Sequence, residues 1–131
     1  MSSLTPDVAL AYVRELSADV RAGIVLDVHG ERLAGAPELE APTKLLLGAR
    51  PHARGLHGVG ENGSQVFVIR NDERAIVVVT GRHALPRVVV RDMRTVMSGN
   101  DGDSGQEVPF ERLDSGLVNP LATAVADAFR P

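Results

Sequence analysis

The 131-residue sequence contains no cysteine and no tryptophan, and aromatic residues make up only 3% of it. Without cysteine, the chain cannot form disulfide bonds, use a catalytic thiol or hold a cysteine-ligated zinc ion. Hydrophobic residues nevertheless account for 44% of the sequence, an ordinary share for a globular fold. Since aromatic rings are scarce, the core has to be built from Val, Leu, Ile and Ala. This length predicts one core, not two.

Long apolar runs and an overall basic charge are also absent. No run approaches the roughly 20 residues needed to span a bilayer, and Met1–Asp7 has neither the basic nor the apolar region of a signal peptide. We therefore expect a cytoplasmic protein without membrane contact. The net charge is −3; residues 1–97 hold 12 basic and 11 acidic side chains, whereas residues 98–131 hold 2 and 6. This acidic balance argues against nucleic-acid binding.

The apolar pattern predicts a mixed α/β (α+β) domain. Thr5 and Pro6 are typical of a helix start and precede an apolar stripe at helical spacing. His29-Gly30 is typical of a tight hairpin turn, with Gly30 supplying a positive φ. The run at 75–80 is apolar throughout, which predicts a central strand. Helices are expected at 6–18, 37–49 and 86–97, and strands at 23–28, 31–35, 56–59, 65–70 and 75–80.

The segment at 37–49 has two features that bear on assembly. Pro42 falls inside it, so either the helix begins near Pro42 or a short turn precedes it. The segment is rich in leucine, and Leu39, Leu45 and Leu46 are our candidate contacts for a dimer interface if they are exposed. The alternative is that these leucines pack on the domain's own sheet.

Gly102-Asp103-Ser104-Gly105 resembles the surroundings of a protease nucleophile, and Asp101 and Asp103 resemble the start of a calcium loop. The chain is too short for the two barrels of such a protease, and Gln106 and Arg112 stand where a calcium loop needs Gly and Glu. Composition instead predicts an acidic, Gly/Ser-rich linker over residues 98–117, between a domain at 1–97 and a C-terminal helix at 118–131 capped by Asn119.

No catalytic, cofactor or metal site is predicted elsewhere. The four histidines match no zinc spacing, and the glycine-rich run at 55–63 lacks the Lys-Ser/Thr of a phosphate loop. One polar cluster could be nominated for an enzyme, but turns explain its residues better: Asp27, His29, Glu31 and Glu61.

Three arginines, Arg87, Arg91 and Arg94, follow one another on a face of the helix expected at 86–97. The face is either simply solvated or bound to something acidic, which would be a partner protein or the acidic tail of this chain. If the tail folds back on these arginines, truncation at Ser98 is expected to strengthen partner binding at low salt.

The order of elements and the hairpin at residues 22–34 resemble the roadblock/dynein light chain family. A Gly, an apolar strand, an Asp, a turn Gly and a short second strand follow one another there, and strands at 66–69 and 75–79 precede a closing helix. The resemblance covers residues 6–97 and implies a five-stranded, mainly antiparallel sheet with helices on both faces. Pro42, the glycine-rich third strand and the additions after residue 98 depart from the family pattern.

The resemblance implies a non-catalytic, homodimeric scaffold or regulator of a small Ras-like GTPase, or of a related signalling or motility complex. It carries over no catalytic residue, cofactor or metal. The alternative is a small-ligand-sensing domain of profilin-like type, which needs a cavity between sheet and helices. The scaffold hypothesis predicts a dimer surface, and the ligand-sensing hypothesis predicts a pocket with converging polar groups.

Overall fold

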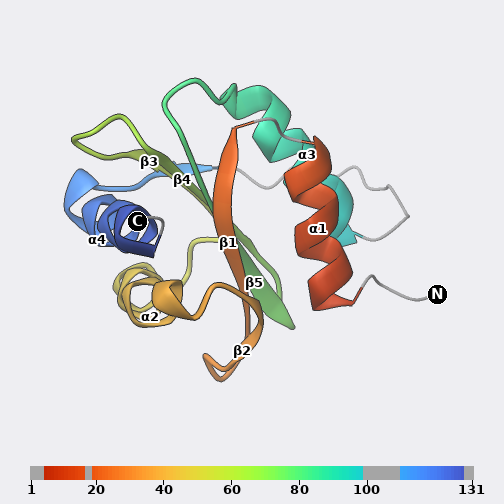
Figure 1. Ribbon diagram of the computed structural model, residues 1–131. Helices are drawn as coiled ribbons and strands as arrows, with labels where there is room; N and C mark the ends of the chain where they lie inside the picture. The colour runs from red at the N-terminus through yellow and green to blue at the C-terminus, as the bar shows by residue number, and fades with distance from the viewer. Residues whose placement is uncertain (1–4, 17–18, 99–109, 129–131) are drawn as a thin grey trace.

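A computed structural model describes residues 5–16, 19–98 and 110–128 (Figure 1). One sheet of six strands runs in the order β2-β1-β5-β4-β3-β6, with helices on both faces (Figure 1). The elements are α1 Pro6–Leu16, β1 Val20–Asp27, β2 Arg32–Gly35, the 3-10 turn η1 Pro37–Leu39, α2 Glu40–Ala49, β3 Gly55–Val59, β4 Gln65–Arg70, β5 Arg74–Thr80, α3 Pro86–Ser98, β6 Glu111–Arg112 and α4 Ser115–Ala128. The α+β class and the mainly antiparallel sheet are confirmed, and β6 is an addition to the five expected strands.

The β1–β2 hairpin forms where the sequence predicts it. Gly30 has a φ of 84°, a conformation that favours glycine. One carboxylate oxygen of Asp27 accepts hydrogen bonds from the backbone N–H groups of His29, at 2.8 Å, and Glu31, at 2.9 Å. The side chain of Asp27 therefore fixes the turn that Gly30 makes possible.

Pro42 does not interrupt the second helix, contrary to the departure noted above. Helix α2 begins at Glu40, directly after the turn η1, so Pro42 is its third residue. The first N–H groups of a helix have no intrahelical acceptor, and a proline there removes no hydrogen bond. Gly48 lies within α2, which ends at Ala49.

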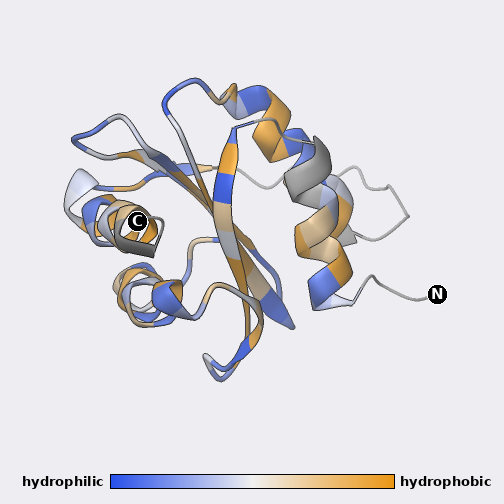
Figure 2. Ribbon diagram, viewed as in Figure 1, coloured by the Kyte–Doolittle hydropathy of each residue, from blue (hydrophilic) through white to orange (hydrophobic). Residues whose placement is uncertain are grey.

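The two faces of the sheet each carry an apolar core. Strand β5 pairs with β1 and β4 along its length and is buried throughout, which confirms its predicted central place. On one face α2 and α4 pack over side chains such as Ile24 and Val77, and on the other α1 and α3 pack over Val25 and Phe67 (Figure 1). Apolar residues, orange in Figure 2, mark these layers. Two helices thus cover each face.

The C-terminal segment differs from the predicted linker and helix. Helix α4 begins at Ser115, not at 118, and contains Asn119 and Pro120 in its interior. Asn119 caps no helix; its side-chain oxygen accepts a hydrogen bond from the N–H of Glu61 at 3.0 Å. Within the expected linker, β6 pairs in parallel with β3. Residues 99–109, with Gly102-Asp103-Ser104-Gly105, lie outside the described residues.

Side chains of the C-terminal segment belong to the same core as the sheet. Leu113, Val118 and Leu121 are at most 2% exposed and pack with strand residues beneath α4. Phe110 packs against the other cluster, under α3. The segment from 110 to 128 therefore completes the domain that begins with α1.

Candidate functional site

The polar cluster nominated for an enzyme is not brought together as a site. Asp27, His29 and Glu31 belong to the β1–β2 turn, whereas Glu61 lies in the β3–β4 turn and is bonded to α4. Over the parts of the chain that the structure describes, no group of three or more His, Asp or Glu residues is placed to hold a metal ion. A search of the same parts finds no helix that is long and apolar enough to cross a membrane.

His57 occupies a more ordered place than a surface loop. It lies on β3, stacks on the Phe67 ring with centroids 4.5 Å apart, and its Nε2 lies 2.8 Å from Oε1 of Gln65. Gln65 in turn donates to the carbonyl of Ala84 at 3.0 Å. These contacts tie β3, β4 and the loop before α3 together, so His57 has a structural role.

The three candidate interface leucines separate into two groups. Leu39 and Leu46 are fully buried in the chain's own core, beneath α2. Leu45 lies on the outer side of the same helix and is 69% exposed. Leu39 and Leu46 are therefore not available to a second molecule, and the predicted interface is reduced to Leu45.

The arginine face lies on α3, as the sequence indicates. Arg87 and Arg91 are exposed, and Arg91 contacts the carboxylate of Asp92 at 3.4 Å. The Arg94 guanidinium lies over the Phe110 ring, 5.6 Å from its centroid, a cation–π distance. Of the acidic tail residues, Glu111 forms an ion pair with Arg50 and not with α3, and residues 101, 103 and 107 lie outside the described ranges.

A groove opens at the N-terminal end of α3. Its lining combines Leu85, Val88, Arg87 and Arg91, and Leu85 is 65% exposed. An exposed leucine and two guanidinium groups therefore line one groove, which combines an apolar contact with positive charge. This surface suits a protein partner with an apolar side chain among carboxylates.

The two edges of the sheet differ in how their strands are paired. At one edge β6 pairs with β3, and the N–H of Leu113 donates to the carbonyl of His57 at 2.9 Å. Arg50 holds β6 there by donating to the carbonyl of Arg112 at 3.0 Å and by pairing with Glu111. At the other edge, β2 pairs only with β1 among the described strands. Both edge strands of the described sheet pair on one side only, and β2, with four residues against two in β6, is the longer open edge.

Comparison with known proteins agrees with this architecture. No protein-family model matches the sequence, and no curated protein matches it. Among solved structures, the chain is similar to the crystal structure of a Roadblock/LC7 domain from Streptomyces avermitilis, with a TM-score of 0.59 and 16% sequence identity. The match covers 74% of this chain and 93% of that one. This chain therefore has a roadblock-like fold.

Proposed function

We propose that this protein is a non-catalytic, cytoplasmic scaffold or regulator that acts as a homodimer on a small Ras-like GTPase or a related signalling or motility protein. The observation that carries the proposal is the α3 groove, presented on a domain of roadblock-like fold. The fold supports a role in protein–protein interaction.

The groove supports a partner surface that is acidic around an apolar side chain. Leu85 supplies the apolar anchor, and Arg87 makes no ion pair with any residue in the described ranges. Arginine is favoured at interfaces because its planar guanidinium binds carboxylates through two hydrogen bonds. Complementary charge would mainly speed association and select the partner.

Homodimer formation is proposed to use the open edge at β2. An unpaired strand edge readily pairs with a second copy across a two-fold axis. The opposite edge is a poorer candidate because its outer strand, β6, has only two residues, both charged. Leu33, 43% exposed on β2, would lie in this contact, and Leu45 is the second candidate contact.

The test is direct binding to a panel of purified small Ras-like GTPases, each loaded with GDP or with a non-hydrolysable GTP analogue. We expect at least one GTPase to bind, and the double variant Arg87→Glu/Arg91→Glu to weaken that binding about tenfold or more because two charge contacts are reversed. Arg82→Glu is the matched control, since Arg82 is an exposed arginine outside the groove. Absence of binding across the panel, or equal loss in the control, would contradict the proposal.

The alternative, a small-ligand-sensing domain, is favoured by one observation. A half-open cleft with converging polar groups lies between the β1–β2 turn and the end of α2. Such a cleft is the feature that a ligand-sensing domain requires.

A further inference from the structure

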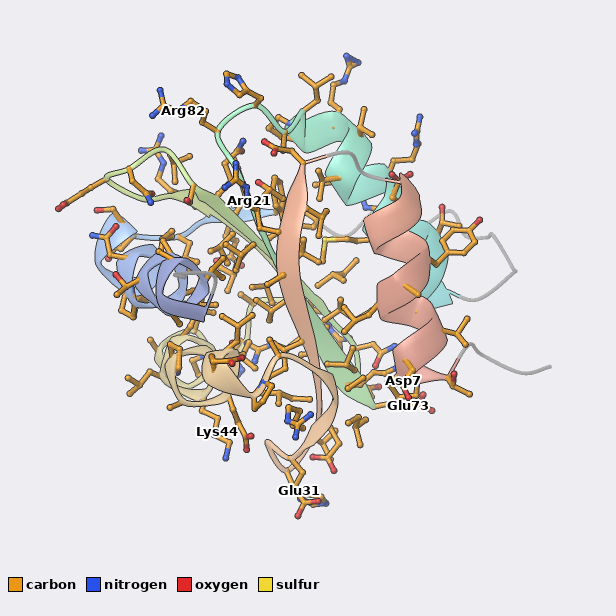
Figure 3. The ribbon with its side chains drawn as sticks, in the orientation of Figure 1. Asp7, Arg21, Glu31, Lys44, Glu73 and Arg82 are labelled. Carbon is orange, nitrogen blue, oxygen red and sulfur yellow. The ribbon has the colours of Figure 1, made fainter. Side chains whose placement is uncertain are left out.

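The cleft lies at the end of the sheet where the β1–β2 and β4–β5 turns meet the second half of α2. Its volume is about 590 Å³, within the usual range of sites for small molecules. In Figure 3, Lys44 and Glu31 mark this end of the molecule, whereas Arg82 lies at the other end. The cleft is thus separate from the α3 groove.

Positive charge dominates the lining of the cleft. Four permanent cations face two carboxylates there: Lys44, Arg54, Arg70 and Arg74 against Asp27 and Asp72. His29 and His52 add two imidazole rings to the lining. Leu26, Leu47 and Ala75 contribute apolar wall. A ligand with a doubly charged head and a small organic body would match this combination.

Both carboxylates of the lining are already engaged by the protein. Asp27 accepts the N–H groups of the β1–β2 turn, and Asp72 pairs with Arg54 at 3.0 Å. The C-terminal end of α2 adds negative partial charge, but the Arg70 guanidinium donates to the carbonyl of Arg50, the residue that follows the helix. An incoming anion would therefore meet net positive charge.

Arg70 is held in place before any ligand arrives. Its Nε donates to the carbonyl of Ala53 at 2.7 Å, and its Nη2 donates to that of Arg50. Burial and, after it, the positive charge of Arg54 lower the pKa of Arg70. Both guanidinium groups line the cleft, and their N–H groups that are not used in these bonds can donate to an anion.

We propose that this cleft binds a small organic dianion, either a phosphate monoester or a dicarboxylate, through Arg54, Arg70 and Lys44. Guanidinium groups bind both kinds of oxyanion with two parallel hydrogen bonds. Lys44, which also lines the cleft, supplies a third charge; its Nζ pairs with Glu40 at 3.3 Å, and Glu40 is shared with Arg32 at 3.8 Å. The inference deepens the ligand-sensing alternative and does not depend on GTPase binding.

The test is isothermal titration calorimetry of the full chain with phenyl phosphate and, separately, with succinate, at constant ionic strength. We expect one of them to bind at one molecule per chain, and Arg54→Ala to weaken that binding about tenfold or more, as loss of a charged hydrogen bond does. Within the described residues, the ion pair of Arg54 is with exposed Asp72, so this variant should fold. Arg82→Ala is the control.

Preference for phenyl phosphate would identify a phosphate monoester as the natural ligand class, and preference for succinate a dicarboxylate. No binding of either probe beyond that in sodium chloride would overturn the inference. So would equal weakening by Arg54→Ala and Arg82→Ala, because general charge screening would then explain the signal. A second variant, Lys44→Ala, should weaken binding as well. The Arg54→Ala variant should also be tested for GTPase binding. The scaffold proposal predicts that this binding is unchanged, so the two proposals can fail independently.

Discussion

At the scale of single residues, two buried threonines have opposite hydrogen-bonding environments. Both Thr43, on α2, and Thr80, at the end of β5, are fully buried. The hydroxyl of Thr80 donates to the carbonyl of Gly81 at 3.0 Å, whereas that of Thr43 has no partner among the described residues. A buried hydroxyl without a partner loses its hydration and gains nothing in return.

We therefore expect Thr43→Val to raise the free energy of unfolding by about 1 kcal/mol, because valine has the same shape without the hydroxyl. Thr80→Val should lower it by a similar amount, since it removes a hydrogen bond that the protein makes. Urea denaturation of both variants checks this. Destabilisation by Thr43→Val would mean that the hydroxyl has a partner after all.

Thr43 also explains why the core side of α2 could not be recognised from the sequence. The buried positions Leu39, Thr43 and Leu46 lie four and three residues apart, the spacing of one helix face. Because Thr43 is polar, the three positions do not form an apolar stripe in the sequence. The exposed Leu45 beside Leu46 adds a leucine that does not belong to the buried face. The buried positions of α2 therefore have helical spacing, but the residue types do not indicate which of the leucines is buried.

Asp27 makes the stability of the β1–β2 hairpin depend on pH. The N–H group of Glu31, and then that of His29, hold the pKa of its carboxyl below the ordinary value of 3.8. A lowered pKa in the folded state means that ionised Asp27 stabilises the fold above that ordinary value and loses the effect as the pH falls through the folded-state pKa.

We expect Asp27→Asn to be less stable than the wild type at pH 7, with a difference that shrinks as the pH falls below about 4. Thermal unfolding of both proteins between pH 7 and pH 3 measures this difference. Because Asp27 is solvated, the effect should also be small. A difference that stays constant over this range would show that charge is not the cause.

At the scale of elements, the C-terminal segment departs most from the sequence prediction. Strand β6 consists of Glu111 and Arg112, two charged residues with no strand pattern, and it forms because β3 offers a free edge. Helix α4 begins after Asp114, whose carbonyl accepts the first N–H at 3.0 Å, and continues through Pro120. Asn119-Pro120 is a typical start signal, and tertiary packing overrides it. In contrast, β1, β4 and β5 carry strong apolar patterns and were predicted correctly.

Truncation at Ser98 is accordingly expected to unfold the protein and not to strengthen partner binding. It would remove Leu113, Val118 and Leu121 from the core, each worth roughly 1.5–3 kcal/mol on burial, from a fold whose total stability is on the order of 5–15 kcal/mol. Far-ultraviolet circular dichroism and a denaturation curve test this. A cooperatively folded truncated protein would show that α4 is dispensable.

A point substitution separates packing from chain length. Leu121→Ala should cost about 2–5 kcal/mol, because it leaves a cavity beneath α4. Thr123→Ala, at an exposed position of the same helix, should change stability by less than about 0.5 kcal/mol. Chemical denaturation of the two variants measures the contrast, and equal effects would contradict the observed packing.

At the scale of the whole molecule, the sequence predicted the architecture better than the sites. The cleft gathers Arg54, Arg70 and Arg74 because β3 begins, β4 ends and β5 begins at the same end of the sheet. The sequence positions of the three arginines show that they lie together only once the strand register is known. The predicted order of antiparallel strands implied it, but the strand ends first had to be placed in space.

The assembly prediction belongs to this scale. We expect light scattering over a dilution series to show a dimer, and Leu33→Lys to shift it toward monomer, since a charge on an edge strand opposes pairing. Leu45→Lys, at a more exposed position on α2, is the comparison. A larger effect at Leu45 would assign the dimer contact to α2, and a wild-type monomer at every concentration would remove the dimer altogether.

The closure of β3 by β6 has a consequence for how the protein is made. Arg50 and the Arg112 carbonyl to which it donates lie 62 residues apart, and the ribosome synthesises α4 after all five strands of the antiparallel sheet. Until β6 and α4 emerge, the edge of β3 and the part of one face that α4 covers stay exposed on the nascent chain. Long-range contacts of this kind slow folding and expose aggregation-prone surface. Folding of this domain should therefore finish only after α4 has emerged, and before that point chaperones that shield apolar strands would be most useful.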